Sequence, residues 1–173
     1  MFLKTIGLFM VISFSAILAT KVIFQTGNCT FKRDVFSNFS MEIINNKIKI
    51  DIYLVGVLKE GLKGHLGFEV RQSKSPSYQS VFQHDINYCA LLKGSQTSIY
   101  SRWFNSMLKS GNFARSCPIY PGYYYIKDWE LKDDLVPTFL FFGDYRIAAS
   151  FYYGKYSKRI KLLVECLIEA LLA

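Results

Sequence analysis

Apolar and polar side chains alternate along several short stretches of this chain. In residues 47–54 (KIKIDIYL), isoleucine or leucine occupies every second position. Residues 62–71 repeat the alternation, with Leu66, Phe68 and Val70 on one side. A period of two places the apolar side chains on one face of a half-buried β-strand. The same signal, with turn residues between the runs, predicts seven or eight short strands among residues 22–31, 47–54, 62–71, 78–86, 122–131, 135–142, 145–153 and 159–168.

One segment has a different period. Within residues 95–109, Ile99, Trp103 and Met107 recur every fourth position, which is typical of an amphipathic helix. Gly111 follows as a natural helix stop. One helix among many short strands favours an antiparallel β-sandwich.

The first twenty residues differ from the rest. Lys4 precedes an almost uninterrupted apolar run over residues 5–18, and small residues at 19 and 20 offer a cleavage point. The run is short for a membrane span, which needs roughly 20 residues. The sequence therefore predicts a secretory signal peptide over residues 1–20 and one domain over residues 21–173. An uncleaved signal anchor is the alternative.

Secretion changes what the cysteines imply. The domain keeps four, an even number, and in an oxidising compartment such cysteines form disulfides. Spacing alone leaves three pairings open among Cys29, Cys89, Cys117 and Cys166. Neither a CxxC nor a CxxH spacing exists, so no metal site or cofactor is expected. Two Asn-x-Ser/Thr tripeptides predict N-glycosylation at Asn28 and Asn38.

The chain is basic, with 21 Lys and Arg against 13 Asp and Glu and a net charge of +8. The signal peptide carries one lysine, so 20 basic residues remain in the domain and its charge is +7. These residues are scattered, and solubility accounts for most of the excess. A positive surface also attracts anionic membranes or acidic glycans. No nucleic-acid-binding motif is visible, so nucleic acid is not an expected partner.

The order of motifs in the second half of the chain resembles a known family. INYCALLKG (86–94) precedes the predicted helix, and GN-x4-CPI-x2-GYYYIKDW (111–129) follows it. VPTFLFFGDYRI (136–147) and FYYGK (151–155) come next. This arrangement resembles the insect secreted family catalogued as domain of unknown function 1091. Its members are similar to ML lipid-recognition domains of the ganglioside-activator type.

That resemblance implies an immunoglobulin-like sandwich whose two sheets splay apart around an acyl chain or another apolar ligand. Some relatives are associated with chemosensory tissue. The resemblance also implies the disulfides Cys29–Cys166 and Cys89–Cys117. The expected fold class is therefore all-β, an immunoglobulin-like antiparallel β-sandwich with one short amphipathic helix and two disulfides.

Aromatic residues crowd residues 116–129 (SCPIYPGYYYIKDW), where simple alternation puts Tyr123, Tyr125 and Trp129 on one face. These rings either fill the sandwich core or form the wall of a pocket. The candidate ligand-binding residues lie on the apolar faces of the predicted strands and helix. They are Ile50, Ile52, Leu54, Leu66, Phe68, Phe82, Ile99, Trp103, Met107, Tyr123, Tyr125, Phe141, Ile147, Phe151, Leu162 and Val164.

Catalysis finds little support in the sequence. His65 and His84 fall on predicted strands and are expected to face the surface, and Ser80 and Ser150 lie in no nucleophile motif. We therefore expect a secreted, non-enzymatic binder of a lipid, fatty acid or hydrocarbon. The alternative is an extracellular module with a solid core, whose basic face binds a receptor, a glycan or an acidic membrane surface. A continuous apolar cavity favours the first hypothesis, and native-density packing favours the second.

Overall fold

The alternation in KIKIDIYL produces the strand β3 (Lys47–Leu54), in which the isoleucines and Leu54 are buried while the residues between them are at least partly exposed. This strand belongs to a computed structural model that describes residues 21–72, 75–94, 99–155 and 158–173, without the side chains of 99 and 158–160. The predicted signal peptide lies outside the described residues.

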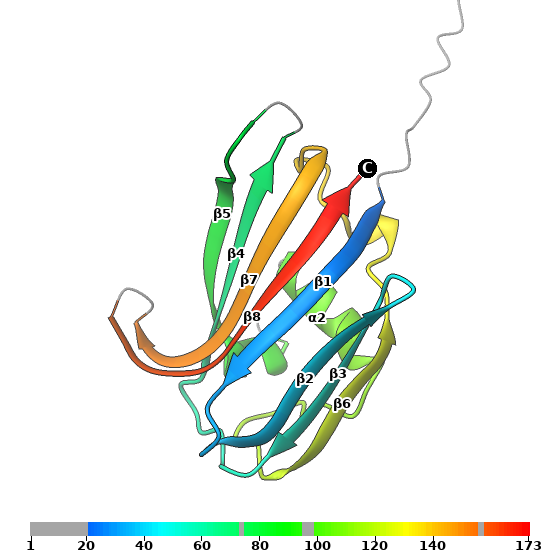
Figure 1. Cartoon of the computed structure of the whole chain (residues 1–173). Helices are drawn as coiled ribbons and strands as arrows, with labels where there is room; N and C mark the ends of the chain where they lie inside the picture. Colours follow the sequence, from blue (N-terminus) through cyan, green and yellow to red (C-terminus); the bar gives the residue numbers. More distant parts are fainter. Residues whose placement is uncertain (1–20, 73–74, 95–98, 156–157) are drawn as a thin grey trace, which may run out of the picture.

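Two antiparallel sheets form the fold (Figure 1). The larger sheet has the order β1 (Val22–Phe31), β8 (Lys158–Leu172), β7 (Gly143–Lys155), β4 (Lys63–Arg71) and β5 (Gln79–Asn87). The smaller sheet has the order β2 (Phe36–Ile44), β3 and β6 (Gly122–Trp129). The fold class expected from the sequence, an antiparallel β-sandwich, is confirmed.

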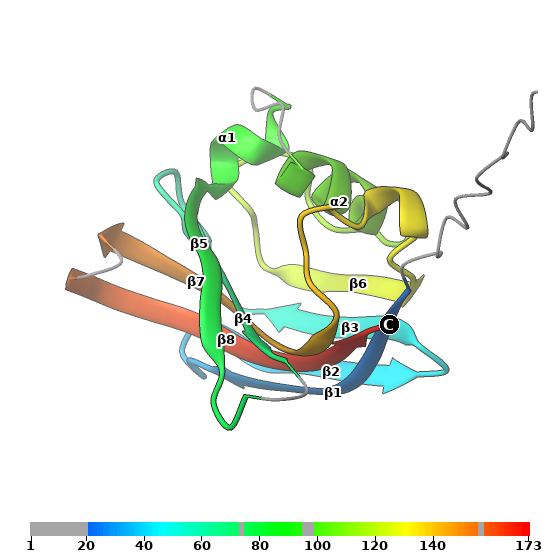
Figure 2. The same ribbon diagram turned by 90° about the horizontal axis from the view of Figure 1, so that it is seen from above.

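The helices cover one open side of the sandwich. The helices α1 (Tyr88–Leu92) and α2 (Ile99–Leu108) lie over the side bounded by the edge strands β5 and β6 (Figure 2). Asn87 caps α1, since its side chain accepts a hydrogen bond from the Ala90 amide at 3.1 Å. The described residues contain no helix that is long and apolar enough to cross a membrane.

Two disulfides tie these elements together, with the pairings that the family resemblance implied. Cys29–Cys166 joins directly opposed residues of β1 and β8. Cys89–Cys117 joins α1 to the segment that leads into β6, and so closes the loop that contains α2. Both pairings are confirmed.

One strand was missed by the sequence analysis, and one predicted strand was wrong. The strand β2 gave no clear signal because a register shift between Phe36 and Asn38 puts Phe36 and Phe39 on the same buried face, three positions apart. Residues 135–142 form no strand; the 3₁₀-helix η1 (Asp133–Leu135) leads into a turn that the Leu140 amide closes on the Pro137 carbonyl at 3.1 Å. Proline has no amide to donate to a neighbouring strand.

The predicted helix over residues 95–109 is present as α2, which begins at Ile99 in the described residues. The short helix α1 gave no periodic signal, because five residues are too few to show one.

Candidate ligand-binding site

A cavity of about 250 Å³, partly open to solvent, lies between the two sheets and beneath α2. Its walls come from the inner faces of β3 and β6 on one side, of β4, β7 and β8 on the other, and from α2. Its largest contributors are aromatic and branched aliphatic side chains. They include Phe24, Phe39, Ile48, Phe68, Tyr88, Tyr100, Trp103, Phe104, Phe113, Trp129 and Phe151.

Nine of the sixteen candidate ligand-binding residues line this one cavity. They share the inward-pointing positions of alternating strands or the inward face of α2. They are Ile50, Ile52, Leu66, Phe68, Trp103, Met107, Ile147, Phe151 and Val164. The period of two on the strands and of four on the helix therefore identified the faces that meet.

Three other candidates lie near the cavity without lining it. Leu54 borders a separate void of about 10 Å³. Phe82 is directly opposed to Phe68 on the edge strand β5, and its ring stacks 4.4 Å from that of Phe68 on the same face of the sheet. Leu162 does not line the cavity because β8 has one residue more than β7 between the pairs Phe151–Val164 and Tyr152–Leu162. This bulge interrupts the alternation that Val164 follows. The Ile99 side chain lies outside the described residues.

Phe141 and the two tyrosines were wrongly placed by the sequence. Phe141 is 58% exposed because its segment is a loop. Tyr123 and Tyr125 point away from the cavity, on the outer face of the smaller sheet, while Ile126 points into it. Trp129 does not share their face, because a register shift with a positive φ of 52° at Asp128 turns the end of the strand over.

The outward tyrosines form a row on the surface. The ring of Tyr123 lies 4.7 Å from that of Tyr53 and 5.8 Å from that of Tyr125, and the Lys127 ammonium lies 4.8 Å from the centre of the Tyr125 ring. The ring faces thus contact one another, so this aromatic surface is a packed row and not a pocket wall.

A hydrogen-bonded carboxylate anchors the row. Tyr123 donates its hydroxyl to Asp51 at 2.5 Å, and Lys49 lies 3.1 Å from the same carboxylate. The hydrogen bond from Tyr123 and the charge of Lys49 lower the pKa of Asp51. The same hydrogen bond raises the pKa of Tyr123 to about 12. Both effects lie on the outer face and do not reach the cavity.

Inside the cavity the polar groups are few, and both indole N–H groups are already engaged. No Lys, Arg, Asp or Glu is among its described lining residues. The indole Nε1 of Trp103 donates to the Leu135 carbonyl at 2.7 Å, and that of Trp129 donates to Ser106 Oγ at 2.8 Å. Burial raises the pKa of Tyr88 well above its ordinary value and also raises that of Tyr100, so both phenols are neutral at physiological pH.

His65 differs from its expected exposure. It is only 6% exposed, although it lies on the outer face of the larger sheet, with its Nδ1 2.7 Å from Asp85 Oδ1. Its Nε2 lies 3.5 Å from the place where a Cβ on Gly67 would be, which is an ordinary contact distance. His84 is exposed, as expected, and its ring stacks 4.9 Å from that of Tyr100.

His65 on β4 is opposed by Ser150 on β7 and by Asp85 on β5. A serine, a histidine and an aspartate therefore follow one another across three strands. Ser150 is 5% exposed, and its Oγ has no hydrogen-bond partner among the described residues. A nucleophile needs both a base within hydrogen-bond reach and access to substrate. The Ser150 hydroxyl has no base within hydrogen-bond reach among the described residues.

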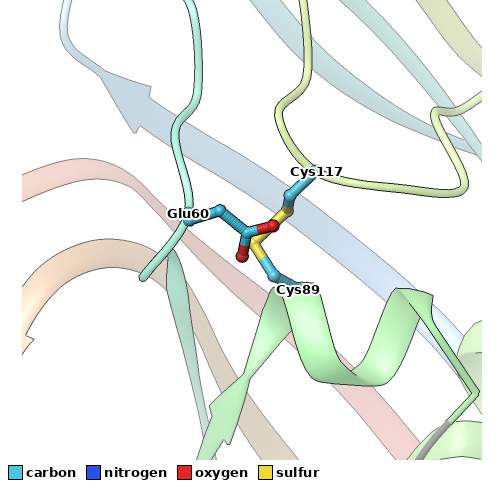
Figure 3. Close-up of side chains that lie close together, drawn as sticks. All are labelled: Glu60, Cys89 and Cys117. Atoms are coloured by element: carbon cyan, nitrogen blue, oxygen red, sulfur yellow. A yellow bond between two sulfur atoms is a disulfide. The ribbon is translucent and has the colours of Figure 1, made fainter.

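Glu60 lies beside the disulfide Cys89–Cys117 (Figure 3). Its carboxylate and the two sulfurs lie within 4.8 Å of one another. Both sulfurs are bonded to each other, so neither is a thiolate that could bind a metal ion. Glu60 instead lies 3.3 Å from the Lys93 ammonium.

Comparison with known proteins gives one family match. Residues 65–147 match the sequence model of a family described as protein of unknown function (DUF1091). The matched segment runs from β4 to the middle of β7 and contains α1, α2 and β6. Among curated proteins, none matches the chain.

Proposed function

We propose that this DUF1091-domain protein is a secreted, non-enzymatic binder of small apolar ligands, which it holds between its two sheets. The observation that carries the proposal is the cavity of about 250 Å³ with an apolar lining. Apolar clefts between layers of secondary structure are the usual sites of small hydrophobic ligands.

The cost of keeping such a cavity supports this function. An unfilled cavity destabilises a protein by about 24 cal/mol per Å³, or about 6 kcal/mol for this one. That is comparable with the whole folding stability of a typical domain, about 5–15 kcal/mol. A chain with 17% aromatic residues has ample material to fill the space, yet the fold leaves it open. An apolar ligand would restore the missing contacts.

The size of the cavity limits the ligand. At ~30 Å³ for a water-sized group, the 250 Å³ cavity holds a chain of about eight carbons. A longer molecule would extend through the open part. The ligand we propose is therefore a slender aliphatic chain, and a bulkier molecule such as a multi-ring probe would fit only by projecting through the open part.

The chemistry of the lining favours an uncharged ligand. A carboxylate in this cavity would have no cation to pair with among the described lining residues. Both indole N–H groups are engaged, and the other polar residues of the described lining are Tyr88, Tyr100 and Ser150, which are uncharged, and His65, whose Nδ1 lies 2.7 Å from Asp85. A hydrocarbon, alcohol or ester matches these groups better than an ionised fatty acid does.

Secretion and a role in chemical sensing complete the proposal. The two disulfides are consistent with an oxidising compartment. A carrier of volatile or cuticular compounds would need a cavity of this size and polarity. We expect the predicted glycans at Asn28 and Asn38 on the outer strands β1 and β2, away from the cavity.

Competition between two ligands of equal length tests the proposal. Delipidated protein is loaded with N-phenyl-1-naphthylamine, whose fluorescence rises in apolar surroundings, and titrated with octanol or octanoate. We expect octanol to displace the probe at any pH from 4 to 8, and octanoate to compete only near or below its own pKa of roughly 4–5. Failure of both the probe and octanol to bind, the latter followed directly by calorimetry, would contradict ligand binding. Stronger displacement by ionised octanoate would contradict the uncharged ligand class.

A further inference from the structure

Three phenylalanines stand exposed on the loop between η1 and β7. Phe139, Phe141 and Phe142 are 58%, 58% and 56% exposed. We call residues 136–142 (VPTFLFF) the Phe loop; it contains no charged residue. Single exposed apolar side chains are ordinary, but three large rings within four residues form a patch of the kind that marks an interaction site.

The Phe loop has a defined shape. The Phe141 amide donates to the Tyr145 hydroxyl at 3.0 Å, and that hydroxyl donates to the Phe141 carbonyl at 2.8 Å. Tyr145 itself is buried. Val136 and Pro137 are also buried, so the base of the loop is fixed in the core. The exposed rings are therefore held outward by internal contacts.

The Phe loop adjoins the cavity. The ring of Phe139 lies 6.1 Å from that of Phe82, and Phe82 stacks 4.4 Å from Phe68, which lines the cavity. At the base of the loop, the Leu135 carbonyl accepts the hydrogen bond from Trp103, another lining residue. Figure 2 shows the chain running here from η1, which contacts α2, to the start of β7. An aromatic path thus joins the surface rings to the cavity wall.

The opposite end of the sandwich carries a different apolar patch, which provides a comparison. The loop enters β7 at Gly143, which pairs with Leu172 at the end of the sheet where β1 begins. Tyr53, Val55, Val57, Tyr120 and Tyr123 are exposed at the other end, where β3 ends and β6 begins. Lys49, Asp51 and Lys127 stand beside the tyrosines there. That patch is amphipathic, whereas the Phe loop is uncharged.

We infer that the Phe loop inserts into the surface of a lipid bilayer or another lipid layer. Protruding rings suit a soft apolar partner better than a protein, which would need a complementary pocket for each ring. The exposed Asp133 and Asp134, which precede the loop, favour an uncharged lipid surface over an anionic one. Insertion would bring the aromatic path next to acyl chains, so that an apolar ligand could pass between the lipid layer and the cavity without crossing water. The insertion stands on the loop alone, and the ligand transfer rests on the proposed function.

Flotation with vesicles tests the insertion. The secreted protein is mixed with vesicles of phosphatidylcholine alone and, separately, with added phosphatidylserine. Phe141→Ser and Phe142→Ser remove one exposed ring each, while Tyr120→Ser removes a ring of similar exposure (63%) at the opposite end. Phe139 is left unchanged because it also contacts Phe82.

We expect the two Phe variants to bind phosphatidylcholine vesicles about tenfold more weakly each, or worse, from the apolar area withdrawn from the lipid. The Tyr120 variant should bind like the unmodified protein, and phosphatidylserine should add little. Equal binding of all variants, or binding that depends on phosphatidylserine alone, would overturn the inference. Loss of a self-associated dimer on Phe141→Ser, seen by analytical ultracentrifugation without vesicles, would assign the loop to a second copy and overturn it too.

The test separates this inference from the proposed function. Uptake of N-phenyl-1-naphthylamine from water should be unchanged in the Phe141 and Phe142 variants, because neither residue lines the cavity. If the protein floats with vesicles but takes up no probe, the insertion holds and the ligand proposal fails. If it takes up the probe but the Phe variants float normally, the ligand proposal holds and the insertion fails.

Discussion

Replacing Ala149 by leucine tests whether the cavity is a real void. Ala149 lies on the inner face of β7, lines the cavity, and is opposed by Leu66 on β4 and Cys166 on β8. A leucine there adds three carbons that point into the cavity. The neighbouring Ala148 points to the outer face, so Ala148→Leu adds the same three carbons outside it and is a matched control.

The sign of the effect on stability distinguishes a void from a packed core. At ~0.8 kcal/mol per buried methylene, three added carbons stabilise the protein by up to about 2.4 kcal/mol if they enter empty space. If the region were already packed, the same leucine would destabilise it by about 1–3 kcal/mol. The Ala148 control should stay within about 0.5 kcal/mol of the unmodified protein.

Two assays measure this prediction. Urea unfolding of delipidated protein reports the free energy of unfolding, and N-phenyl-1-naphthylamine titration reports ligand binding. We expect Ala149→Leu to raise the unfolding free energy and to weaken binding roughly 50-fold, which is the loss of about three methylene contacts. A destabilised Ala149→Leu protein that still binds the probe normally would refute the reasoning.

Two further predictions concern the frame around the cavity. Gly111→Ala should destabilise the protein by about 3 kcal/mol in thermal or urea unfolding, because the new Cβ would lie 1.8 Å from the Tyr125 carbonyl oxygen. Gly122→Ala is the control, because its Cβ would meet nothing nearer than 3.8 Å. Equal destabilisation by both substitutions would contradict the steric reason. Tyr123→Phe should raise the pKa of Asp51 toward its ordinary 3.8, as followed by carboxyl ¹³C NMR. Because the folded-state pKa of Asp51 is lowered, its stabilising contribution is present above pH 3.8 and is lost as the pH falls through the folded value. The difference in unfolding free energy between the unmodified protein and Tyr123→Phe should therefore vanish in acid. A difference that is the same at low and neutral pH would contradict this.

Most of the fold could be predicted from the sequence because the strands keep a period of two over several residues between their register shifts. The isoleucines of 47–54 alternate without interruption, and both ends of β3 were predicted correctly. The disulfide pairing came from the family resemblance, since spacing alone left three choices open. The match over residues 65–147 bears out that resemblance to DUF1091.

Three of the errors share a physical cause, which is the β-bulge. One extra residue in a strand moves every following side chain to the other face. Such shifts hid β2, displaced Leu162 from the cavity, and separated Trp129 from the tyrosines of β6. The period of the apolar residues does not predict where a bulge will form, because the position of a bulge depends on the partner strand.

The cavity itself was beyond the reach of the sequence. The inward positions of strands and helix could be named, but whether their side chains meet or leave space depends on how far apart the sheets lie. The Phe loop was misjudged for a related reason. Its apolar residues suggested a buried strand, and only the neighbouring turn and the hydroxyl of Tyr145 show that the rings face outward.

Native mass spectrometry of the secreted protein tests the central claim most directly. The protein is purified from eukaryotic cells without detergent, measured intact, and measured again after extraction with organic solvent. We predict an additional mass of one to a few hundred daltons that the solvent removes, and that proves on analysis to be an uncharged aliphatic compound. A protein that carries no such mass, and takes up no octanol when it is supplied, would contradict the claim that the cavity is a ligand-binding site.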